Sequence, residues 1–376
     1  MKYKFKISHI IIASVNAAAI AASIVLTAVG GSLAKSQDYN LAYERWKGDN
    51  TEDFAQISCY FSESAGFAQN SVNSARSQLI SALTDAAYDT ADNTHPFIDA
   101  YSGYYGTETV RSDINGRANA EITAVGGDFF FFHDFELADG AYISDDDLSK
   151  DGAVIDRETA WLLYGSDDVA GMNLYIGNIQ FYISGVIENP DTKADKLCAD
   201  DTPKVYISYE KASELSGSTA QMSEYSTGFD KVTAYECIMP EPVENFGSTT
   251  FKKIIGDSYM DKVSVISNSE RFTPKKRCKA LKNIEKTVIH NDGIRYPAWE
   301  NASRIVEFKL SYIYTARKYL LFLPTATLLF LCIKLFILWQ KNKAELKKAA
   351  LSFIRKRLPK KNKNTTKPTT ERINLS

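Results

Sequence analysis

The residue types that most often perform catalysis are sparse in this sequence. It contains 4 histidines, His9, His95, His133 and His290, and only His133 has an acidic neighbour, Asp134. A catalytic pair requires side chains that converge in space, which adjacency in sequence does not provide. We interpret His133 as a surface histidine or a hydrogen-bonded buried one, with a role in acid–base catalysis as the alternative.

Four aspartates form an acidic run, Asp145, Asp146, Asp147 and Asp151, which could bind Ca²⁺ outside a cell. The run lacks the glycine at the sixth position and the closing glutamate of an EF-hand loop. We predict a solvated turn here, with calcium binding as the alternative.

Motifs for a catalysed reaction are also missing. The sequence has no G-x-x-x-x-G-K-[ST] loop, no H-E-x-x-H and no G-x-S-x-G, so the chain itself is not expected to hydrolyse ATP. We predict no catalytic, cofactor-binding or metal-binding residue, no cofactor and no enzymatic activity. A hydrolase on a membrane anchor is an alternative that the missing motifs disfavour.

Cysteines and aromatic residues both admit a structural interpretation. Spacing specifies no disulfide among Cys59, Cys198, Cys237 and Cys278, and Cys332 lies in an apolar stretch. Cys59 and Cys237 fall in predicted strands, where buried free thiols are common.

The block Phe129–Phe132 is predicted as a strand covered on both faces, with a lipid- or peptide-binding lip as the alternative. The same two interpretations apply to the tyrosines Tyr101, Tyr104 and Tyr105.

Charge is sorted along the chain, although the formal net charge of the 376 residues is only −2. Residues 1–6 carry +3 and residues 341–376 carry +10, whereas residues 7–340 hold 29 Lys/Arg against 44 Asp/Glu, a net −15. The chain is therefore basic at both ends and acidic between them.

Two apolar stretches separate these parts. Ile7–Val29 is long enough to span a bilayer, with a cleavable secretory signal as the alternative. Tyr319–Trp339 is interrupted only by Lys334, which is near enough to the end of the span to reach the headgroups. By the positive-inside rule, both termini are predicted to be cytoplasmic, and everything between the spans lies outside the cell membrane.

We therefore expect four parts: a cytoplasmic stub and first transmembrane helix (1–34), an extracytoplasmic domain (35–318), a second transmembrane helix (319–340) and a basic cytoplasmic tail (341–376). Within the domain, sequence patterns predict strands at 56–61, 205–208 and 232–239, helices at 72–86, 156–165, 210–215 and 274–290, and a hairpin of 172–176 with 179–186 around Gly177-Asn178. This order predicts an α+β domain with an inserted β-rich lobe at about 97–190.

Between residues 120 and 188, short motifs follow one another in a recognisable order. They are Gly126-Gly127-Asp128-Phe129-Phe130, Leu137-Ala138-Asp139-Gly140, Ala153-Val154-Ile155-Asp156, Ala160-Trp161-Leu162-Leu163-Tyr164-Gly165, Gly171 and Phe181-Tyr182-Ile183-Ser184-Gly185-Val186. Together they resemble the extracytoplasmic core domain of MacB-like (FtsX-like) ABC-transporter permeases. Tyr164 stands where that family usually has Phe.

The resemblance implies a two-lobed domain and a permease-type subunit that works beside a cytoplasmic ATP-binding protein, usually as a dimer. The family pattern has four membrane helices, and no sequence after Lys341 is apolar enough to span, so we expect the last two helices to be missing or supplied by a second permease chain. The segment Lys341–Lys361 would follow the second span as a coupling segment. Leu346, Ala350, Phe353 and Ile354 amid its Lys and Arg favour an amphipathic helix on anionic lipid, with docking to an ATPase as the alternative.

The leading hypothesis is a non-enzymatic permease-like subunit of an ABC-type transporter or mechanotransmission complex, acting on an extracytoplasmic substrate or partner. Its expected partners are the lipid bilayer, a separate ATP-binding subunit, a second permease chain and a second copy of itself, and no nucleic acid. The alternative is a membrane-anchored extracytoplasmic binding or sensor protein that has lost transport coupling.

Overall fold

The computed structural model describes residues 7–49, 51–88, 96–219, 229–281 and 293–357, without the side chains of residues 218–219, 344–346 and 349–357. The chain forms two compact units. One contains Met1–Ser23 and Lys318–Ser376, and the other, which we call the body, is Ile24–Arg317.

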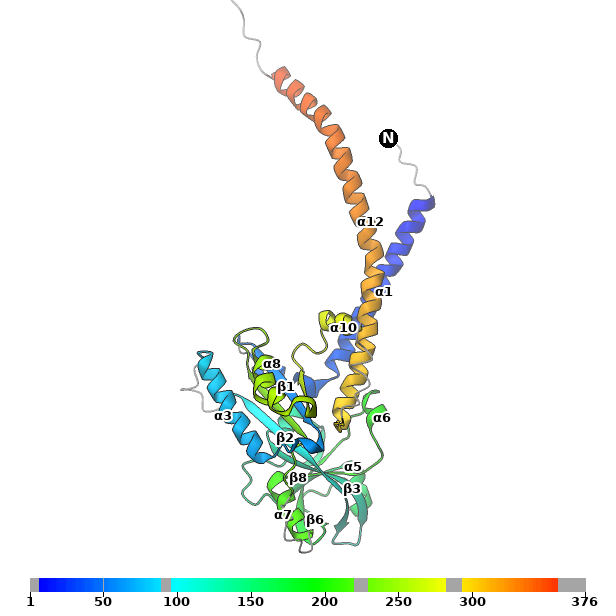
Figure 1. Ribbon diagram of the computed structural model, residues 1–376. Coiled ribbons are helices and arrows are strands. Elements are labelled where there is room, and N and C mark those ends of the chain that lie inside the picture. The colour runs from blue at the N-terminus through cyan, green and yellow to red at the C-terminus, as the bar shows by residue number, and fades with distance from the viewer. Residues whose placement is uncertain (1–6, 50, 89–95, 220–228, 282–292, 358–376) are drawn as a thin grey trace, which may run out of the picture. The chain divides into compact units, whose positions relative to one another are not determined.

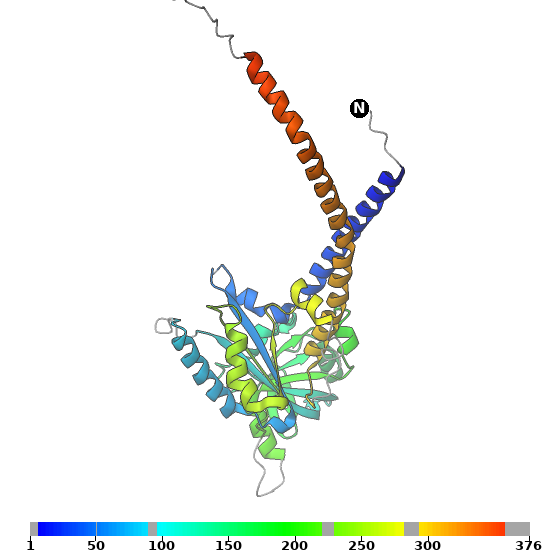
Figure 2. The same cartoon turned by 45° about the horizontal axis from the view of Figure 1, so that its top comes forward.

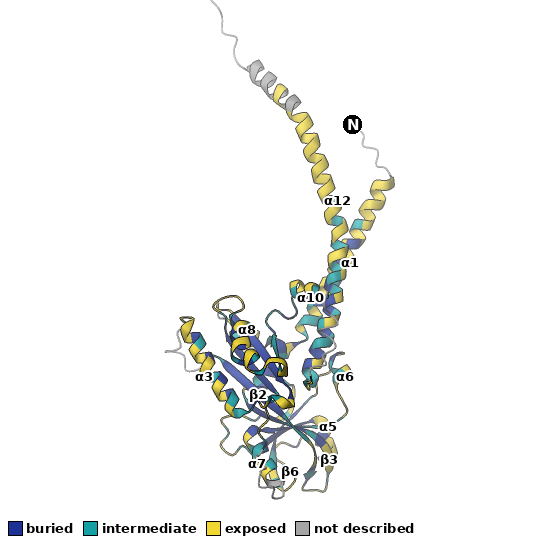
Figure 3. Ribbon diagram, viewed as in Figure 1, coloured by how far each residue is buried: buried dark blue, intermediate teal, exposed yellow. Residues whose placement is uncertain are grey.

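In the described residues, the first unit contains the N-terminal part of helix α1 and the C-terminal part of helix α12, and both helices continue into the body. Helix α1 is Ile7–Lys35, and α12 is a continuous helix of 60 residues, Ala298–Arg357, which runs through Pro324. Two segments of described helix, Ile7–Lys35 and Ala298–Lys343, are long and apolar enough to cross a membrane, and their apolar side chains are largely exposed (Figure 3). Between the two helices, Asn16 donates a hydrogen bond to Thr327 over 2.9 Å.

In its described residues, the body is built on one sheet of ten strands, and Figure 1 shows how the strands are arranged. The strands are β1 (Phe54–Phe61), β2 (Ile98–Ser112), β3 (Arg117–Gly127), β4 (Leu137–Gly140), β5 (Gly152–Asp156), β6 (Asn173–Ile176), β7 (Ile179–Ile187), β8 (Lys204–Ser208), β9 (Ala234–Pro240) and β10 (Val263–Ser267). Their order is β10-β1-β9-β2-β3-β8-β5-β7-β4, with β6 paired to both β2 and β7.

Strand β2 joins an open sheet to a closed ring of strands. Its first part, Ile98–Ser102, pairs with β9, and its last part, Val110–Ser112, pairs with β6 on the same edge, while β3 follows the other edge. The pairs β2-β3-β8-β5-β7-β6 then return to β2 and close the ring. A bulge between Tyr104 and Gly106 lies where β2 passes from one part to the other.

The described part of the body contains further helical segments, several of which contact strands of the sheet. They are η1 (Asp38–Leu41), α2 (Ala42–Lys47), η2 (Glu63–Ala65), α3 (Gln69–Asp85), α4 (Phe129–Phe132), α5 (Arg157–Tyr164), α6 (Asp195–Cys198), α7 (Tyr209–Thr219), α8 (Phe246–Phe251), the π-helical turn η3 (Lys252–Gly256), α9 (Asp257–Tyr259), η4 (Met260–Lys262) and α10 (Pro274–Ala280). Helix α3 lies beside the helical run that begins with α8 (Figures 1 and 2).

Local sequence explains α5 in full. The Asp156 carboxylate accepts a hydrogen bond from the backbone N–H of Thr159, which satisfies a donor at the helix start. Gly165 ends the helix with φ 70°, a conformation that glycine adopts without a Cβ penalty. The helix contacts strands β2, β3, β5, β7 and β8, so it covers the strand ring.

Most of the predicted elements are confirmed. The α+β class, the strand at 56–61, the helix at 72–86, the capped helix after Asp156 and the hairpin at Gly177-Asn178 all appear at these positions. Helix α10 confirms the start of the basic helix predicted at 274–290, and residues 282–292 lie outside the described residues. So do the side chains of Leu346, Ala350, Phe353 and Ile354, and the lobe boundary at about 97–190 stays a prediction.

The strand predicted for the four-phenylalanine block is wrong. Phe129–Phe132 is one turn of helix, because β3 ends at Gly127, whose φ is 65°. The predicted core packing is nevertheless confirmed, since Phe129, Phe130 and Phe132 are buried with Tyr206 and the strand face around it. Helical spacing, rather than strand alternation, presents three of the four rings to the core.

Candidate functional site

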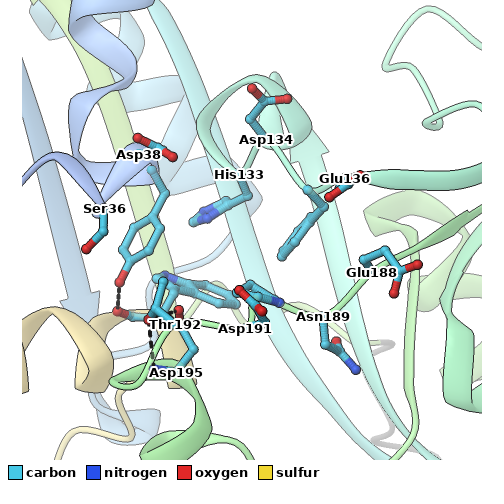
Figure 4. Close-up of a pocket in the computed structure, with 14 residues that line it drawn as sticks. Ser36, Asp38, His133, Asp134, Glu136, Glu188, Asn189, Asp191, Thr192 and Asp195 are labelled. Carbon is cyan, nitrogen blue, oxygen red and sulfur yellow. Dashed lines mark hydrogen bonds between the residues drawn. The ribbon is translucent and has the colours of Figure 1, made fainter. Parts of the chain in front are cut away.

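One cleft in the body combines an acidic rim with aromatic walls (Figure 4). Its volume is about 390 Å³. Its residues come from the end of α1 and η1, the loop after α4, the segment from β7 to α6, and the start of α12. They are Ser36, Asp38, Tyr39, His133, Asp134, Phe135, Glu136, Glu188, Asn189, Pro190, Asp191, Thr192, Asp195 and Trp299.

Six carboxylates line this cleft, and Figure 4 shows them around its aromatic centre. Glu188 pairs with Arg157 at 2.6 Å, and Asp191 is 3.8 Å from Lys196. The other four have no ion-pair partner among the described residues: Asp38, Asp134, Glu136 and Asp195. Among the described residues, no Lys or Arg lines the cleft, so the charges of its lining are negative.

His133 lies at the aromatic wall of the cleft and is only 3% exposed. Its ring centroid is 4.6 Å from that of Trp299, 4.4 Å from Phe129 and 6.2 Å from Tyr39. Its Nε2 is 2.6 Å from Oε2 of Glu236, a buried residue of β9. A hydrogen-bonded buried histidine, as expected from the sequence, is thus found, but the partner of its Nε2 is Glu236 rather than the adjacent Asp134.

A chain of buried hydrogen bonds continues from this pair through β9 and β1 to the loop after β10. Ser58 Oγ donates to Glu236 over 2.7 Å, and Asn268 Nδ2 donates to Ser58 over 2.8 Å. Asn268 Oδ1 in turn accepts from Arg271 over 3.2 Å. Each of these residues is buried, so the polar atoms of this chain satisfy one another where water is excluded.

Arg271 ends this chain in a buried ion cluster at the base of α12. It donates to both carboxylate oxygens of Glu300 at 2.7 Å and lies 3.2 Å from Glu307. Burial lowers the pKa of the Arg271 guanidinium, but the Glu300 and Glu307 carboxylates outweigh this effect, and the net result is a pKa well above the usual value. Arg277 and Arg304 join the same carboxylates at 2.7 and 2.8 Å.

The two ends of the body are tied together beside the cleft. The hydroxyl of Tyr39 donates to the backbone carbonyl of Trp299, and Asn40 Nδ2 donates to Ser303 Oγ over 2.6 Å. Burial raises the pKa of the Tyr39 hydroxyl well above its ordinary value, so this donor keeps its proton. These hydrogen bonds therefore hold η1, which follows α1, against the first turns of α12.

A second hollow of about 270 Å³ adjoins the cleft and shares five lining residues with it: Phe135, Asn189, Pro190, Asp195 and Trp299. In it, the Arg295 guanidinium stacks on the Tyr104 ring at 3.6 Å and lies 3.8 Å from Glu121. Burial raises the pKa of Glu121, and the positive charge of Arg295 opposes this effect. This hollow is mixed in charge, with Lys204 and Lys231 also in its lining.

The other residues singled out from the sequence lie apart from the cleft. Asp145, Asp146, Asp147 and Asp151 belong to an exposed or half-exposed loop, where Lys150 and Ser149 contact them. Within the described part of the chain, no three His, Cys, Asp or Glu side chains are grouped to hold a metal ion.

The cysteines and tyrosines singled out from the sequence differ in burial. Cys59 and Cys237 are buried free thiols, and burial raises the pKa of each, so neither is a reactive nucleophile. Tyr101 is buried in the core, whereas Tyr104 and Tyr105 are half-buried. Sequence reasoning missed Tyr39, Glu236 and Trp299, since no local pattern indicates that these distant residues meet.

Comparison with known proteins identifies the fold. The sequence model of the MacB-like periplasmic core domain matches residues 13–234, more than half of the chain. The chain belongs to this family. Its MacB-like periplasmic core domain, of the ABC-type transporter permease family, is flanked by two described helices that are long and apolar enough to cross a membrane.

Solved structures give a weaker likeness. One is the extracellular domain of the noncanonic ABC-type transporter YknZ from Gram-positive bacteria, with 13% identity, a TM-score of 0.37, and coverage of 56% of this chain and 99% of that one. Another is the periplasmic region of MacB from Actinobacillus actinomycetemcomitans, with 11% identity, a TM-score of 0.39, and coverage of 64% and 98%. No curated protein matches the chain.

Proposed function

We propose that this MacB-like chain is a non-enzymatic, permease-like subunit of an ABC-type assembly. In this proposal both termini lie in the cytoplasm, the body lies outside, and a separate ATP-binding subunit supplies the energy. The subunit acts on a substrate or partner outside the membrane, together with a second permease chain or a second copy of itself.

The observation that carries the proposal is the buried ion cluster of Arg271, Glu300 and Glu307. It attaches the base of α12, the helix that contains the second apolar span, to the loop after β10 and so to the sheet. Breaking one partner of such a buried pair costs about 3–5 kcal/mol. In this proposal, a movement of α12 driven from the cytoplasm moves the sheet as well, because the ion cluster holds the base of α12 to the loop after β10.

Copurification tests this proposal. The tagged full chain, extracted from its native membrane in mild detergent, should retain an ATP-binding protein that contains a phosphate loop and that mass spectrometry identifies at a constant ratio. The complex should hydrolyse ATP, and the chain purified away from that partner should not. Hydrolysis that follows the isolated chain through every purification step would contradict the non-enzymatic assignment.

The cleft favours a second candidate function, a membrane-anchored binding or sensor protein without transport coupling. Ligand binding by the body does not by itself require an ATPase. If no ATP-binding protein is recovered from membranes in which the chain is folded and abundant, this candidate replaces the permease-like one.

A further inference from the structure

The acidic cleft has the dimensions of a ligand site and a surplus of negative charge. Its volume of about 390 Å³ falls in the range of small-molecule pockets. Asp38, Asp134, Glu136 and Asp195 all face it without an ion-pair partner among the described residues. Low-dielectric walls focus such a field, which raises the local concentration of cations.

The spacing of these carboxylates favours an organic cation over a metal ion. A divalent metal needs several ligand atoms within about 2–2.6 Å of one point. Within the described ranges, no group of three His, Cys, Asp or Glu side chains comes together in this way. The charges instead surround a space large enough for a molecule.

The buried imidazole of His133 in the cleft wall is a second and independent observation, because one of its two ring nitrogens has a hydrogen-bond partner and the other is left for a ligand. His133 is 3% exposed and lines the cleft, and its Nε2 is bonded to Glu236, a carboxylate that can only accept. In the neutral ring the proton therefore lies on Nε2, and Nδ1 is left as an acceptor. Within the described part of the chain, Nδ1 has no hydrogen-bond partner, so it is available to an N–H donor in the cleft.

Aromatic rings complete the site. Tyr39, Phe135 and Trp299 line the cleft with their rings, and aromatic faces attract cations through their quadrupole. Nε1 of Trp299 is buried without a hydrogen-bond partner among the described residues. An apolar ligand body would be covered by these rings while its charge reached the rim.

We propose that the cleft binds a primary or secondary ammonium group carried on an apolar body. The ammonium N–H groups bond to His133 Nδ1 and the rim carboxylates, and the apolar body packs on Trp299 and Phe135. A quaternary ammonium satisfies the charge but offers no N–H to the imidazole. The site therefore discriminates between the two kinds of cation.

Calorimetric titration of the full chain in nanodiscs, with empty nanodiscs subtracted, tests the proposal. The probes are phenethylamine, its N,N,N-trimethyl analogue and the uncharged 2-phenylethanol. We expect the amine to bind about tenfold or more tightly than either analogue, a difference typical of one charge-assisted hydrogen bond. Equal affinity for the amine and the alcohol would overturn the proposal, and equal affinity for the two cations would overturn the role of His133.

A matched pair of triple variants locates the site. Asp38→Asn, Asp134→Asn and Glu136→Gln neutralise three exposed rim carboxylates and should weaken amine binding about tenfold or more. Glu108→Gln, Asp146→Asn and Asp261→Asn remove the same charge at exposed positions outside the cleft and should leave binding within about twofold. Equal losses in both variants would show a general effect of net charge and reject the cleft. The test uses no ATP-binding partner, so its outcome is separate from that of the copurification experiment.

Discussion

Arg271 neutralises buried carboxylates at the base of α12, those of Glu300 and Glu307. Its side chain is 2% exposed, and that of its partner Glu300 is 1% exposed. We expect Arg271→Met to lower the free energy of unfolding of the body by about 3–5 kcal/mol, because it leaves a carboxylate buried with part of its compensation gone. Chemical denaturation of the full chain, followed by tryptophan fluorescence, measures this loss.

Arg157 provides the matched control. It also pairs with two carboxylates, Asp167 at 2.8 Å and Glu188 at 2.6 Å, but its side chain is 46% exposed. Arg157→Met should therefore cost no more than about 1 kcal/mol. A similar loss for both variants would mean that burial adds nothing to the cluster at Arg271.

Ionisation of the Glu121 carboxyl should lower the free energy of unfolding of the body as pH rises. Burial raises the pKa of its carboxyl in the folded chain, so the folded state binds its proton more tightly than the unfolded state, and this contribution to stability is lost as pH rises through the folded pKa. Glu121→Gln should thus stabilise the body at pH 7 and make little difference below the ordinary carboxyl pKa. Thermal unfolding of both chains at pH 4 and pH 7 measures this, and a destabilised variant at pH 7 would show that the contact with Arg295 outweighs burial.

At the scale of elements, the β2–β3 turn and the end of α5 are packed together so closely that only glycine fits. A Cβ on Gly116 would lie 2.0 Å from the backbone oxygen of Leu163, and Ser112 Oγ donates to that same oxygen. Gly116→Ala should therefore lower stability by about 1–3 kcal/mol or more. Gly217→Ala, in α7 with nothing within 4 Å of the added carbon, should instead raise it by up to about 1 kcal/mol. Equal thermal shifts in the two variants would contradict this account.

The elements that sequence predicted well are those whose signals are local. The Asp156 cap and Gly165 delimit α5, and the Gly177-Asn178 turn joins β6 to β7, within a few residues each. Phe129–Phe132 was predicted wrongly because aromatic runs favour strands, whereas here the chain turns at Gly127 and the rings fill a core formed by distant residues. Local pattern could not show that β6 closes a ring with β2.

The candidate site was harder to predict than the elements. His133 and Glu236 are separated by 103 residues, and Tyr39 and Trp299 by 260. No spacing rule connects residues so far apart, and the partner that adjacency suggested, Asp134, lies on the exposed rim instead. Composition did indicate that residues 7–340 are acidic, with a net charge of −15. Four carboxylates from this range line the cleft without an ion-pair partner among the described residues.

At the scale of the whole molecule, the sorting of charge predicts sidedness. In a background with the five cysteines replaced, a cysteine introduced at Ser216 should react with an impermeant maleimide added outside intact cells, and one at Asn364 should react only after permeabilisation. The basic flanks are the physical reason, since Lys and Arg remain on the cytoplasmic side of a span. Labelling at residue 364 in intact cells would reverse the proposed orientation.

Strand β1 has a consequence for how the protein is made. All 8 of its residues are buried, and among the described strands its partners are β9 and β10, which begin at Ala234 and Val263. The chain is made from its N-terminus, so β1, which ends at Phe61, is made 173 residues before β9 begins at Ala234 and 202 residues before β10 begins at Val263, with its apolar side chains and both edges uncovered. In the proposed topology the sheet therefore closes only after most of the body has crossed the membrane, and we expect β1 to be the segment most prone to aggregation until then.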